Sequence, residues 1–212
     1  MAARISLRDR LKAALHDRLS ARFEHAHGAE LRRRQLTPAS GRVLEIGGGT
    51  GANLPHYPPT VDELLVSEPN DGMRRRAERR AHDERTAATI VKAAAEDLPF
   101  ADGSLDTVVG TFVLCSVDDQ TRALAEIRRV LKPGGQLLFA EHVRAGDPKL
   151  ATWQDRLERP WRILVDGCHP NRDTLAAIER AGFQVEDVER GELPMVPRLV
   201  RPYVAGRARK PA

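Results

Sequence analysis

The sequence contains few cysteines and few aromatic residues. Two of its 212 residues are cysteine, Cys115 and Cys168, and 4% are Phe, Trp or Tyr. Two cysteines form neither a disulfide framework nor a zinc site of four thiolates, and their scarcity favours a reducing cytoplasm. No run reaches the roughly 18–20 apolar residues of a membrane span, and the first ten residues lack the apolar core of a signal peptide. We therefore expect a cytoplasmic protein with no integral membrane segment.

Positive charge is concentrated near the start of the chain. The net charge is +4, yet residues 1–42 carry ten basic and four acidic side chains, so the remainder has a net charge of −2. A body with that balance does not present the basic surface that nucleic acid requires. Hydrophobic residues make up 41% of the chain and charged residues 30%. These values are typical of a globular protein, and the length suits one domain.

Residues 6–27 have the periodicity of a helix. Apolar residues recur every four positions from Leu7 to Phe23, between basic faces. Such a helix could rest on an anionic membrane or pack as a lid on the body, and the acidic residues that interrupt its positive face favour the lid. We expect residues 28–41 to be a linker with solvated arginines. The predicted organisation is an N-terminal helical lid over 1–41 and a body over 42–212.

From residue 42 onward, short β-rich runs alternate with helical ones. Strands are predicted at 43–46, 61–67, 89–93, 107–113, 136–140, 183–188 and 200–208. Helices are predicted at 71–85, 118–131, 153–165 and 172–181. This alternation, with short connections, predicts an α/β fold in which a doubly wound, seven-stranded and mostly parallel sheet is covered on both faces.

The first predicted strand runs into a glycine cluster, VLEIGGGTG at 43–51. Gly47, Gly49 and Gly51 permit positive φ and let a ligand approach the backbone, at the place where open α/β sheets bind nucleotides. This spacing also fits the dinucleotide fingerprint. Glu68 ends the second strand, where a carboxylate can accept hydrogen bonds from both ribose hydroxyls of NAD or of S-adenosylmethionine.

Glu45 helps to separate these two ligands. A pyrophosphate favours a neutral or basic loop, whereas a carboxylate just before the glycines attracts a ligand that carries an ammonium and a sulfonium. Alternatively, or in addition, Glu45 could be a strand-end carboxylate bound to a nearby backbone amide or arginine.

Four ordered segments resemble the class I S-adenosylmethionine-dependent methyltransferases. They are VLEIGGGTGAN from 43, SEPND from 67, AAEDLPFADGSLDTVVGTFVLCSV from 94 and EIRRVLKPGGQLLF from 126. LCSVDD, EHV, WQDRLERPWRILVDGC and LVRPYVAG are similar to the thiol methyltransferase-like branch of animal microsomes and its bacterial relatives. The chain departs from the animal members in lacking their apolar N-terminal anchor. The resemblance implies a Rossmann-like fold with S-adenosylmethionine as cofactor.

The resemblance also implies which residues bind this cofactor. Asn53 would lie near its carboxylate, Pro69 and Met73 beside its adenine, and a backbone carbonyl near Leu114 or Cys115 would accept from its ammonium. Many relatives have Asp where this chain has Ala94, so Glu96 or Asp97 is expected to make the adenine contact. The full expected set is Glu45, Gly47, Gly49, Gly51, Asn53, Glu68, Pro69, Met73, Ala95, Glu96, Asp97, Leu114 and Cys115.

Methyl transfer depends mainly on alignment and exclusion of water. A thiol reacts chiefly as its thiolate, with an ordinary pKa of ~8.5, so a nearby base or cation helps. His142, at the end of the fifth strand, is the first candidate base and His169 the second; either could instead only hold its loop. Trp153 and Trp161 could line an apolar substrate pocket or merely pack their helix on the sheet.

Neither cysteine is expected to act as a nucleophile, and no His and carboxylate set has metal-ligand spacing, so no metal is expected. The sequence therefore predicts an S-adenosylmethionine-dependent methyltransferase that acts on a small molecule, with the sulfur of a thiol as the favoured acceptor. O- or C-methylation of a small natural product is the alternative. A nucleic-acid methyltransferase, an NAD-linked oxidoreductase and a peripheral membrane module are the alternatives of other classes.

Overall fold

The computed structural model describes residues 23–165 and 167–212. Most of the helix predicted over 6–27, and with it most of the predicted lid, lies outside these residues. From Glu24 the chain forms a π-helical turn, η1 (Glu24–Gly28), that leads directly into helix α2 (Ala29–Leu36). The prediction of a linker over 28–41 is therefore wrong, because α2 occupies much of it and buries Leu31 and Leu36.

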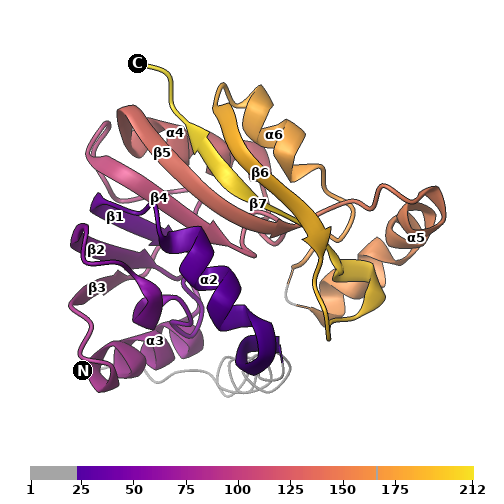
Figure 1. The fold of residues 1–212 in the computed structure, drawn as a ribbon, viewed down its shortest axis with the longest axis horizontal. Helices are drawn as coiled ribbons and strands as arrows, with labels where there is room; N and C mark the ends of the chain where they lie inside the picture. Colours follow the sequence, from indigo (N-terminus) through magenta and orange to yellow (C-terminus); the bar gives the residue numbers. More distant parts are fainter. Residues whose placement is uncertain (1–22, 166) are drawn as a thin grey trace.

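A single sheet runs through the described residues, with strand order β3-β2-β1-β4-β5-β7-β6 (Figure 1). Its strands are β1 (Gly41–Ile46), β2 (Val61–Ser67), β3 (Ala88–Val91), β4 (Leu105–Thr111), β5 (Leu131–His142), β6 (Gln184–Glu192) and β7 (Pro202–Arg209). All pairs are parallel except those of β7, which is antiparallel to both β5 and β6. The predicted seven-stranded, mostly parallel sheet is confirmed.

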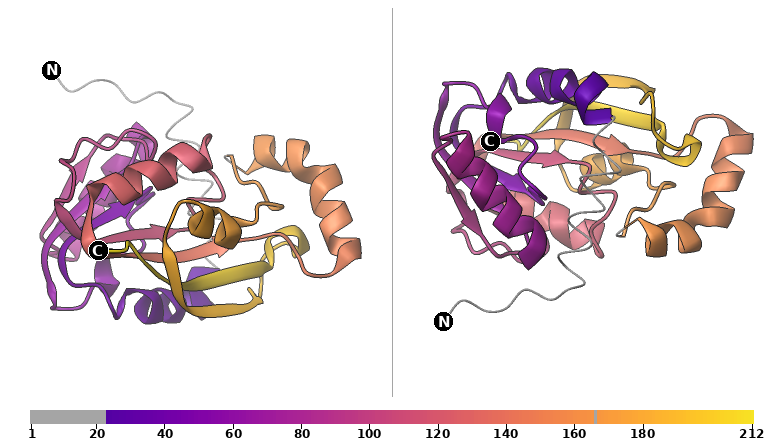
Figure 2. Two further views of the ribbon diagram at one scale, coloured as in Figure 1. Left: turned by 90° about the horizontal axis from the view of Figure 1, so that it is seen from above. Right: turned by 90° about the horizontal axis from the view of Figure 1, so that it is seen from below.

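Helices cover both faces of this sheet (Figure 2). Successive strand residues point to opposite faces. Leu44 and Ile46 of β1 therefore belong to the apolar cluster that contains side chains of α4 (Gln120–Val130) and α6 (Thr174–Arg180). Val43 belongs to a second cluster, with Leu36 of α2 and Ala81 of α3 (Asp71–Asp83). Glu45 shares the face of Val43, so its carboxylate lies on the side of α2 and α3.

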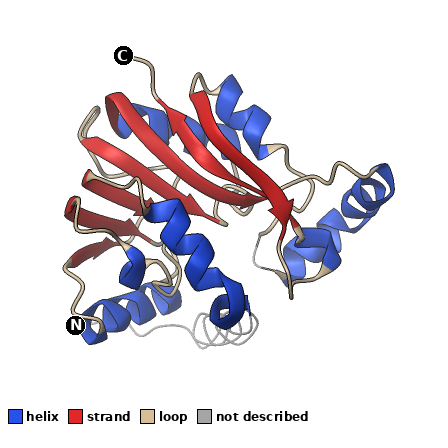
Figure 3. Cartoon of the chain, in the orientation of Figure 1, coloured by secondary structure: helices blue, strands red, loops and turns tan. Residues whose placement is uncertain are grey.

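Side-chain caps define where the helices begin. In each of four helices, the side chain of the preceding residue accepts a hydrogen bond from a backbone amide of the first turn. These capping residues are Asn70 for α3, Asp119 for α4, Asp147 for α5 and Asp173 for α6. Helix α5 (Pro148–Leu164) begins five residues earlier than predicted, because Asp147 caps it and proline suits the first turn. Figures 1 and 3 show α5 set apart from the sheet, beyond the end of β5.

Two predicted strand ends differ for local reasons. β4 ends at Thr111, because Phe112 adopts a left-handed conformation with φ of 58° that turns the chain. β5 begins at Leu131, five residues before the predicted start at 136, and its pairing with β4 changes register between Leu105 and Thr107. Among the described residues, none of the helices has the length and apolar character of a membrane span.

Candidate functional site

The glycine loop follows β1 at the carboxyl edge of the parallel strands. Gly47, Gly49 and Gly51 have φ of 55°, 56° and 83°. A Cβ added at Gly47 would lie 1.9 Å from Cγ2 of Val113, and one added at Gly51 would lie 3.2 Å from Cα of Ala77. A Cβ added at Gly49 would meet only the carbonyl oxygen of Gly47, at 4.0 Å. Packing therefore requires glycine at 47 and 51, whereas Gly49 leaves open space where a ligand can approach the backbone.

Glu68, at the end of β2, faces this loop. Its Oε2 accepts a hydrogen bond from the backbone N–H of Gly49 at 2.9 Å, and its Oε1 accepts one from that of Asn70 at 2.7 Å. Asn70 in turn accepts from the amide of Met73 in the first turn of α3. The structure thus brings Gly49, Glu68 and Met73 together, while Pro69 between them is exposed.

Glu45 is buried behind the glycine loop. Its Oε1 accepts from Nδ2 of Asn53 at 3.0 Å, and its Oε2 accepts from the hydroxyl of Tyr57 at 2.8 Å. Burial raises the pKa of Glu45 to about 7, against the opposing effect of Tyr57, Arg32 and Asn53. Its carboxyl group therefore titrates near neutral pH. The donors to the Glu45 carboxylate are thus the side chains of Asn53 and Tyr57. The alternative in which a backbone amide or an arginine binds this carboxylate directly is wrong.

Helix α2 completes this polar network. Arg32 is buried, donates from Nη1 to Oδ1 of Asn53 at 2.7 Å and forms an ion pair with Glu24 at 2.5 Å. One turn further on, Gln35 donates to a backbone carbonyl of β4 at 3.0 Å and accepts from the hydroxyl of Thr111 at 3.0 Å. The expectation that the arginines at 32–34 are solvated is therefore wrong for Arg32.

The segment after β3 shows three different environments. Ala95 is buried, Glu96 is half-buried and Asp97 is exposed. Oε1 of Glu96 accepts from the backbone N–H groups of Asp118 at 2.9 Å and Asp119 at 3.3 Å, just before α4. Glu96 therefore orients the loop that precedes α4, and the adenine contact of Glu96 or Asp97 stays a prediction.

The loop after β4 is held by Glu141, a residue outside the predicted site. Its buried carboxylate accepts from the backbone amides of Val113, Leu114 and Cys115 at 3.1, 2.9 and 3.0 Å. Burial raises the pKa of Glu141, and these amides oppose the shift. The signal in the sequence is an acidic residue that ends the apolar run LLFA, directly before His142.

The backbone carbonyls of this loop already have donors. The Leu114 carbonyl accepts from Nη1 of Arg172 at 2.8 Å and from Nε2 of Gln120 at 3.1 Å. The Cys115 carbonyl accepts from the backbone N–H of His169 at 2.8 Å. A cofactor ammonium at either carbonyl would therefore have to share the acceptor.

His142 lies against both cysteines. Its Nδ1 is 3.7 Å from Sγ of Cys115 and 3.9 Å from Sγ of Cys168. Its ring stacks on Phe112 with centroids 4.5 Å apart, and Phe112 also makes an edge contact with Phe23 at 6.3 Å. The neighbouring Cys168 and burial raise the pKa of Cys115, whereas contact with Cys115 lowers the pKa of Cys168.

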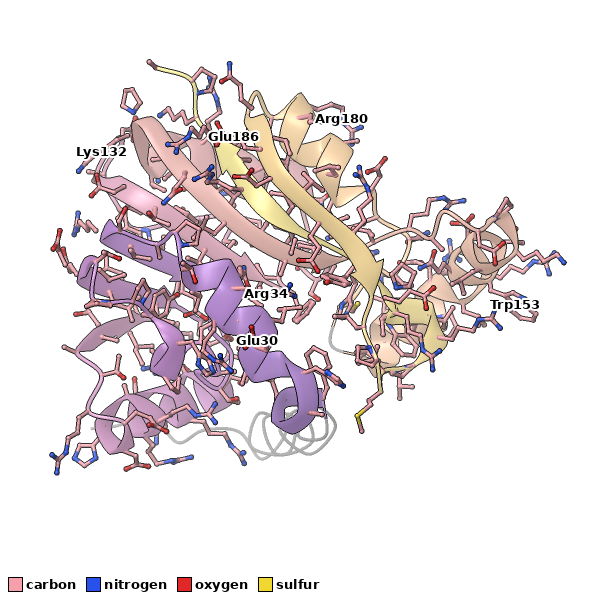
Figure 4. All side chains as sticks on the ribbon, viewed as in Figure 1. Glu30, Arg34, Lys132, Trp153, Arg180 and Glu186 are labelled. Atoms are coloured by element: carbon pink, nitrogen blue, oxygen red, sulfur yellow. The ribbon has the colours of Figure 1, made fainter. Side chains whose placement is uncertain are left out.

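The other residues predicted to lie near the methyl acceptor, Trp153, Trp161 and His169, have three different environments. Trp161 packs in an apolar cluster with Cys115 and Cys168. Nδ1 of His169 lies 2.8 Å from Oε1 of Glu158, and burial lowers the pKa of His169. Trp153 is 55% exposed and points away from the sheet at the outer side of α5 (Figure 4). Trp161 therefore lies in the cluster of the two cysteines that contact His142, whereas Trp153 lies away from it.

Comparison with known proteins adds to this geometry. A family model described as a methyltransferase domain matches residues 44–139. The human thiol S-methyltransferase TMT1A is 39% identical over 79% of this chain and 70% of its own length. The ubiquinone/menaquinone biosynthesis C-methyltransferase UbiE of Bordetella avium is 35% identical over 66% of this chain and 62% of its own length. The structure of an S-adenosylmethionine-dependent methyltransferase of Thermotoga maritima, described as a possible histamine N-methyltransferase, has a TM-score of 0.69 at 22% identity and covers 93% of this chain and 95% of that one.

Proposed function

Because this chain belongs to the class I S-adenosylmethionine-dependent methyltransferases, we propose that it methylates the sulfur of a small thiol. The family establishes S-adenosylmethionine as the cofactor and supports a small molecule as the methyl acceptor. The likeness to a human thiol S-methyltransferase carries the choice of sulfur. The contacts of His142, at the end of β5, with the buried thiols of Cys115 and Cys168 support it further, because these groups form an environment suited to another sulfur atom.

The described residues fit this cofactor at the glycine loop. The open space beside Gly49 admits a ligand to the backbone, and Glu68 offers carboxylate oxygens there to ribose hydroxyls. Glu45, behind the same loop, provides negative charge when its carboxyl group is ionised, above its pKa of about 7. When bound, S-adenosylmethionine supplies a methyl group activated by an adjacent sulfonium.

The acceptor would approach from the side of His142. Val113 joins the glycine loop to the loop that carries Cys115, since it packs directly against Gly47. Phe112 fixes the imidazole plane by stacking, so Nδ1 faces the sulfur atoms. In this proposal His142 accepts the thiol proton, and the apolar cluster with Trp161 keeps water from the resulting thiolate.

A matched panel of acceptors tests the proposal. The purified protein is incubated with isotopically labelled S-adenosylmethionine and an alkyl thiol, the corresponding alcohol, a phenol or an amine, and products are identified by mass spectrometry. We expect the label in a thioether. His142→Ala should lower turnover with little loss of cofactor affinity, whereas His82→Ala, on an exposed face of α3, should change neither. Labelled phenol or amine without labelled thioether would contradict the proposal.

C-methylation is a second candidate, favoured by the similarity to UbiE. A demethylated quinol added to the same panel separates the two functions, because the label would then appear on a ring carbon. Transfer to the quinol and not to the thiol would select C-methylation.

A further inference from the structure

We propose that Cys115, His142 and Cys168 form a binding site for one zinc ion, whose open fourth position takes the thiol acceptor. The role of the fourth position rests on the proposed thiol methylation, whereas the metal site itself does not. The three residues come from the loop after β4, the end of β5 and the loop after α5.

The distances between the ligand atoms suit a tetrahedral ion. The two sulfur atoms and a ring nitrogen of His142 all lie within 4.8 Å of one another. Zinc bonds of about 2.3 Å to sulfur and about 2.0–2.1 Å to nitrogen place sulfur and nitrogen about 3.6 Å apart in a tetrahedron. Nδ1 of His142 is 3.7 and 3.9 Å from the two sulfurs. Both nitrogen–sulfur distances are therefore within a few tenths of an ångström of the tetrahedral value.

The type and number of ligands favour zinc with a position left for substrate. Two thiolates and an imidazole form a set that zinc accepts, whereas magnesium and calcium prefer oxygen. Structural zinc sites have four protein ligands, and catalytic sites commonly have three. Within the described part of the chain, this cluster has no fourth His, Cys, Asp or Glu.

The surrounding groups hold the ligands in place, as outer-shell partners do in metal sites. Glu141 binds the backbone amide of Cys115, and Phe112 stacks on His142. The indole N–H of Trp161 is buried without a hydrogen-bond partner among the described residues, and Trp161 packs in the cluster of both cysteines. It can therefore donate to a thiolate sulfur.

The metal would take over the role proposed for His142. Binding of zinc displaces the protons of both cysteines to solvent. An acceptor thiol that binds the fourth position likewise releases its proton to solvent, so its sulfur is a thiolate at neutral pH and keeps lone pairs for methyl transfer. Nδ1 of His142 is then a ligand and does not accept the thiol proton.

Metal binding is measured independently of activity. The full chain is reduced, stripped with a chelator and titrated with Co²⁺ as a spectroscopic probe, followed by Zn²⁺. We expect one Co²⁺ per chain, with sulfur-to-cobalt charge-transfer absorption and the strong visible bands of a tetrahedral site, displaced by one Zn²⁺. Cys168→Ser should weaken binding by at least about 100-fold, since loss of an outer-shell partner alone costs about 10–100-fold. His169→Gln, beside Cys168 but outside the cluster, should bind cobalt as the parent does.

Cys115→Ser serves as a second ligand variant, and circular dichroism checks that each variant is folded. Absence of stoichiometric binding, or unchanged binding in the folded serine variants, overturns the metal site. Addition of an alkyl thiol to the cobalt protein should shift the charge-transfer bands, whereas the corresponding alcohol should not. Cobalt bands that do not respond to the thiol overturn the acceptor role. Failure of the proposed function looks different: the bands respond to the thiol, yet no thioether forms.

Discussion

Glu68 links the glycine loop to α3 through a single carboxylate. Glu68→Ala removes the acceptor for the amides of Gly49 and Asn70 together with the predicted ribose contact. Because hydrogen bonds to a charged group contribute about 1.5–3 kcal/mol, we expect affinity for S-adenosylhomocysteine to fall about 10- to 100-fold. Calorimetric titration measures this. Glu63→Ala, in an exposed ion pair on the same strand, is the control. Equal affinity in both variants would remove Glu68 from the cofactor site.

Glu45 makes stability depend on pH in an unusual direction. Burial raises its pKa from 4.5 to about 7. Between these values the folded protein keeps a proton that the unfolded chain releases, so this residue's contribution to the free energy of unfolding decreases as pH rises through the window. Relative to Glu45→Gln, the wild type should lose on the order of 3 kcal/mol between pH 5 and 8. Urea denaturation at the two pH values measures the difference, and parallel pH profiles would contradict it.

At the scale of structural elements, two glycines in turns, Gly49 and Gly103, have the same backbone conformation and can be compared. Gly49 and Gly103 have φ of 56° and 57°, and a Cβ at either would meet no close atom. Alanine at either position should therefore cost about 1 kcal/mol of stability through backbone strain. We expect Gly49→Ala alone to weaken S-adenosylhomocysteine binding, because its methyl group enters the predicted ligand space. Retained affinity in Gly49→Ala would show that the ligand does not approach there.

Helix α2 contains two neighbouring arginines, of which Arg32 is buried and Arg33 is exposed, so their substitutions can be compared. Arg32→Ala leaves Asn53 and Glu24 without their partner in a largely buried network. For this change we expect a loss of about 2 kcal/mol in the free energy of unfolding. Arg33→Ala removes only an exposed pair with Glu30, and it should cost less than about 0.5 kcal/mol. Chemical denaturation compares the two variants. Equal small losses would mean that α2 does not depend on this network.

The same elements show what sequence patterns can predict. The central strands β1, β4 and β5 were predictable because their buried parts are covered on both faces and appear as apolar runs. Helix α2 was not, because Arg32 and Gln35 on its buried side are held by hydrogen bonds, which leave no apolar periodicity. The place of Glu68 beside the glycine loop was predictable because it follows a strand, and its contact with the ribose stays a prediction. The cluster around His142 was not, because its cysteines lie 27 and 26 residues away in other elements.

At the scale of the whole molecule, the strands and the apolar clusters described here lie between Phe23 and the C-terminus. The lid predicted over 1–41 lies largely outside the described residues and stays a prediction. Removal of residues 1–22 should leave cooperative unfolding intact, since the sheet and its helices remain. Turnover should fall if the segment excludes water from the reacting groups. Thermal denaturation and steady-state kinetics measure the two effects, and unchanged turnover would make the lid prediction wrong.

Two ring contacts connect Phe23, the first described residue, with His142. Phe23 meets the edge of Phe112, and Phe112 stacks on the imidazole of His142. We therefore expect a tilt of the helix at its amino end to shift the imidazole through these two ring contacts. Because the ring current of Phe112 affects the stacked imidazole, the chemical shifts of the carbon-bound protons of His142 should report that tilt in nuclear magnetic resonance spectra.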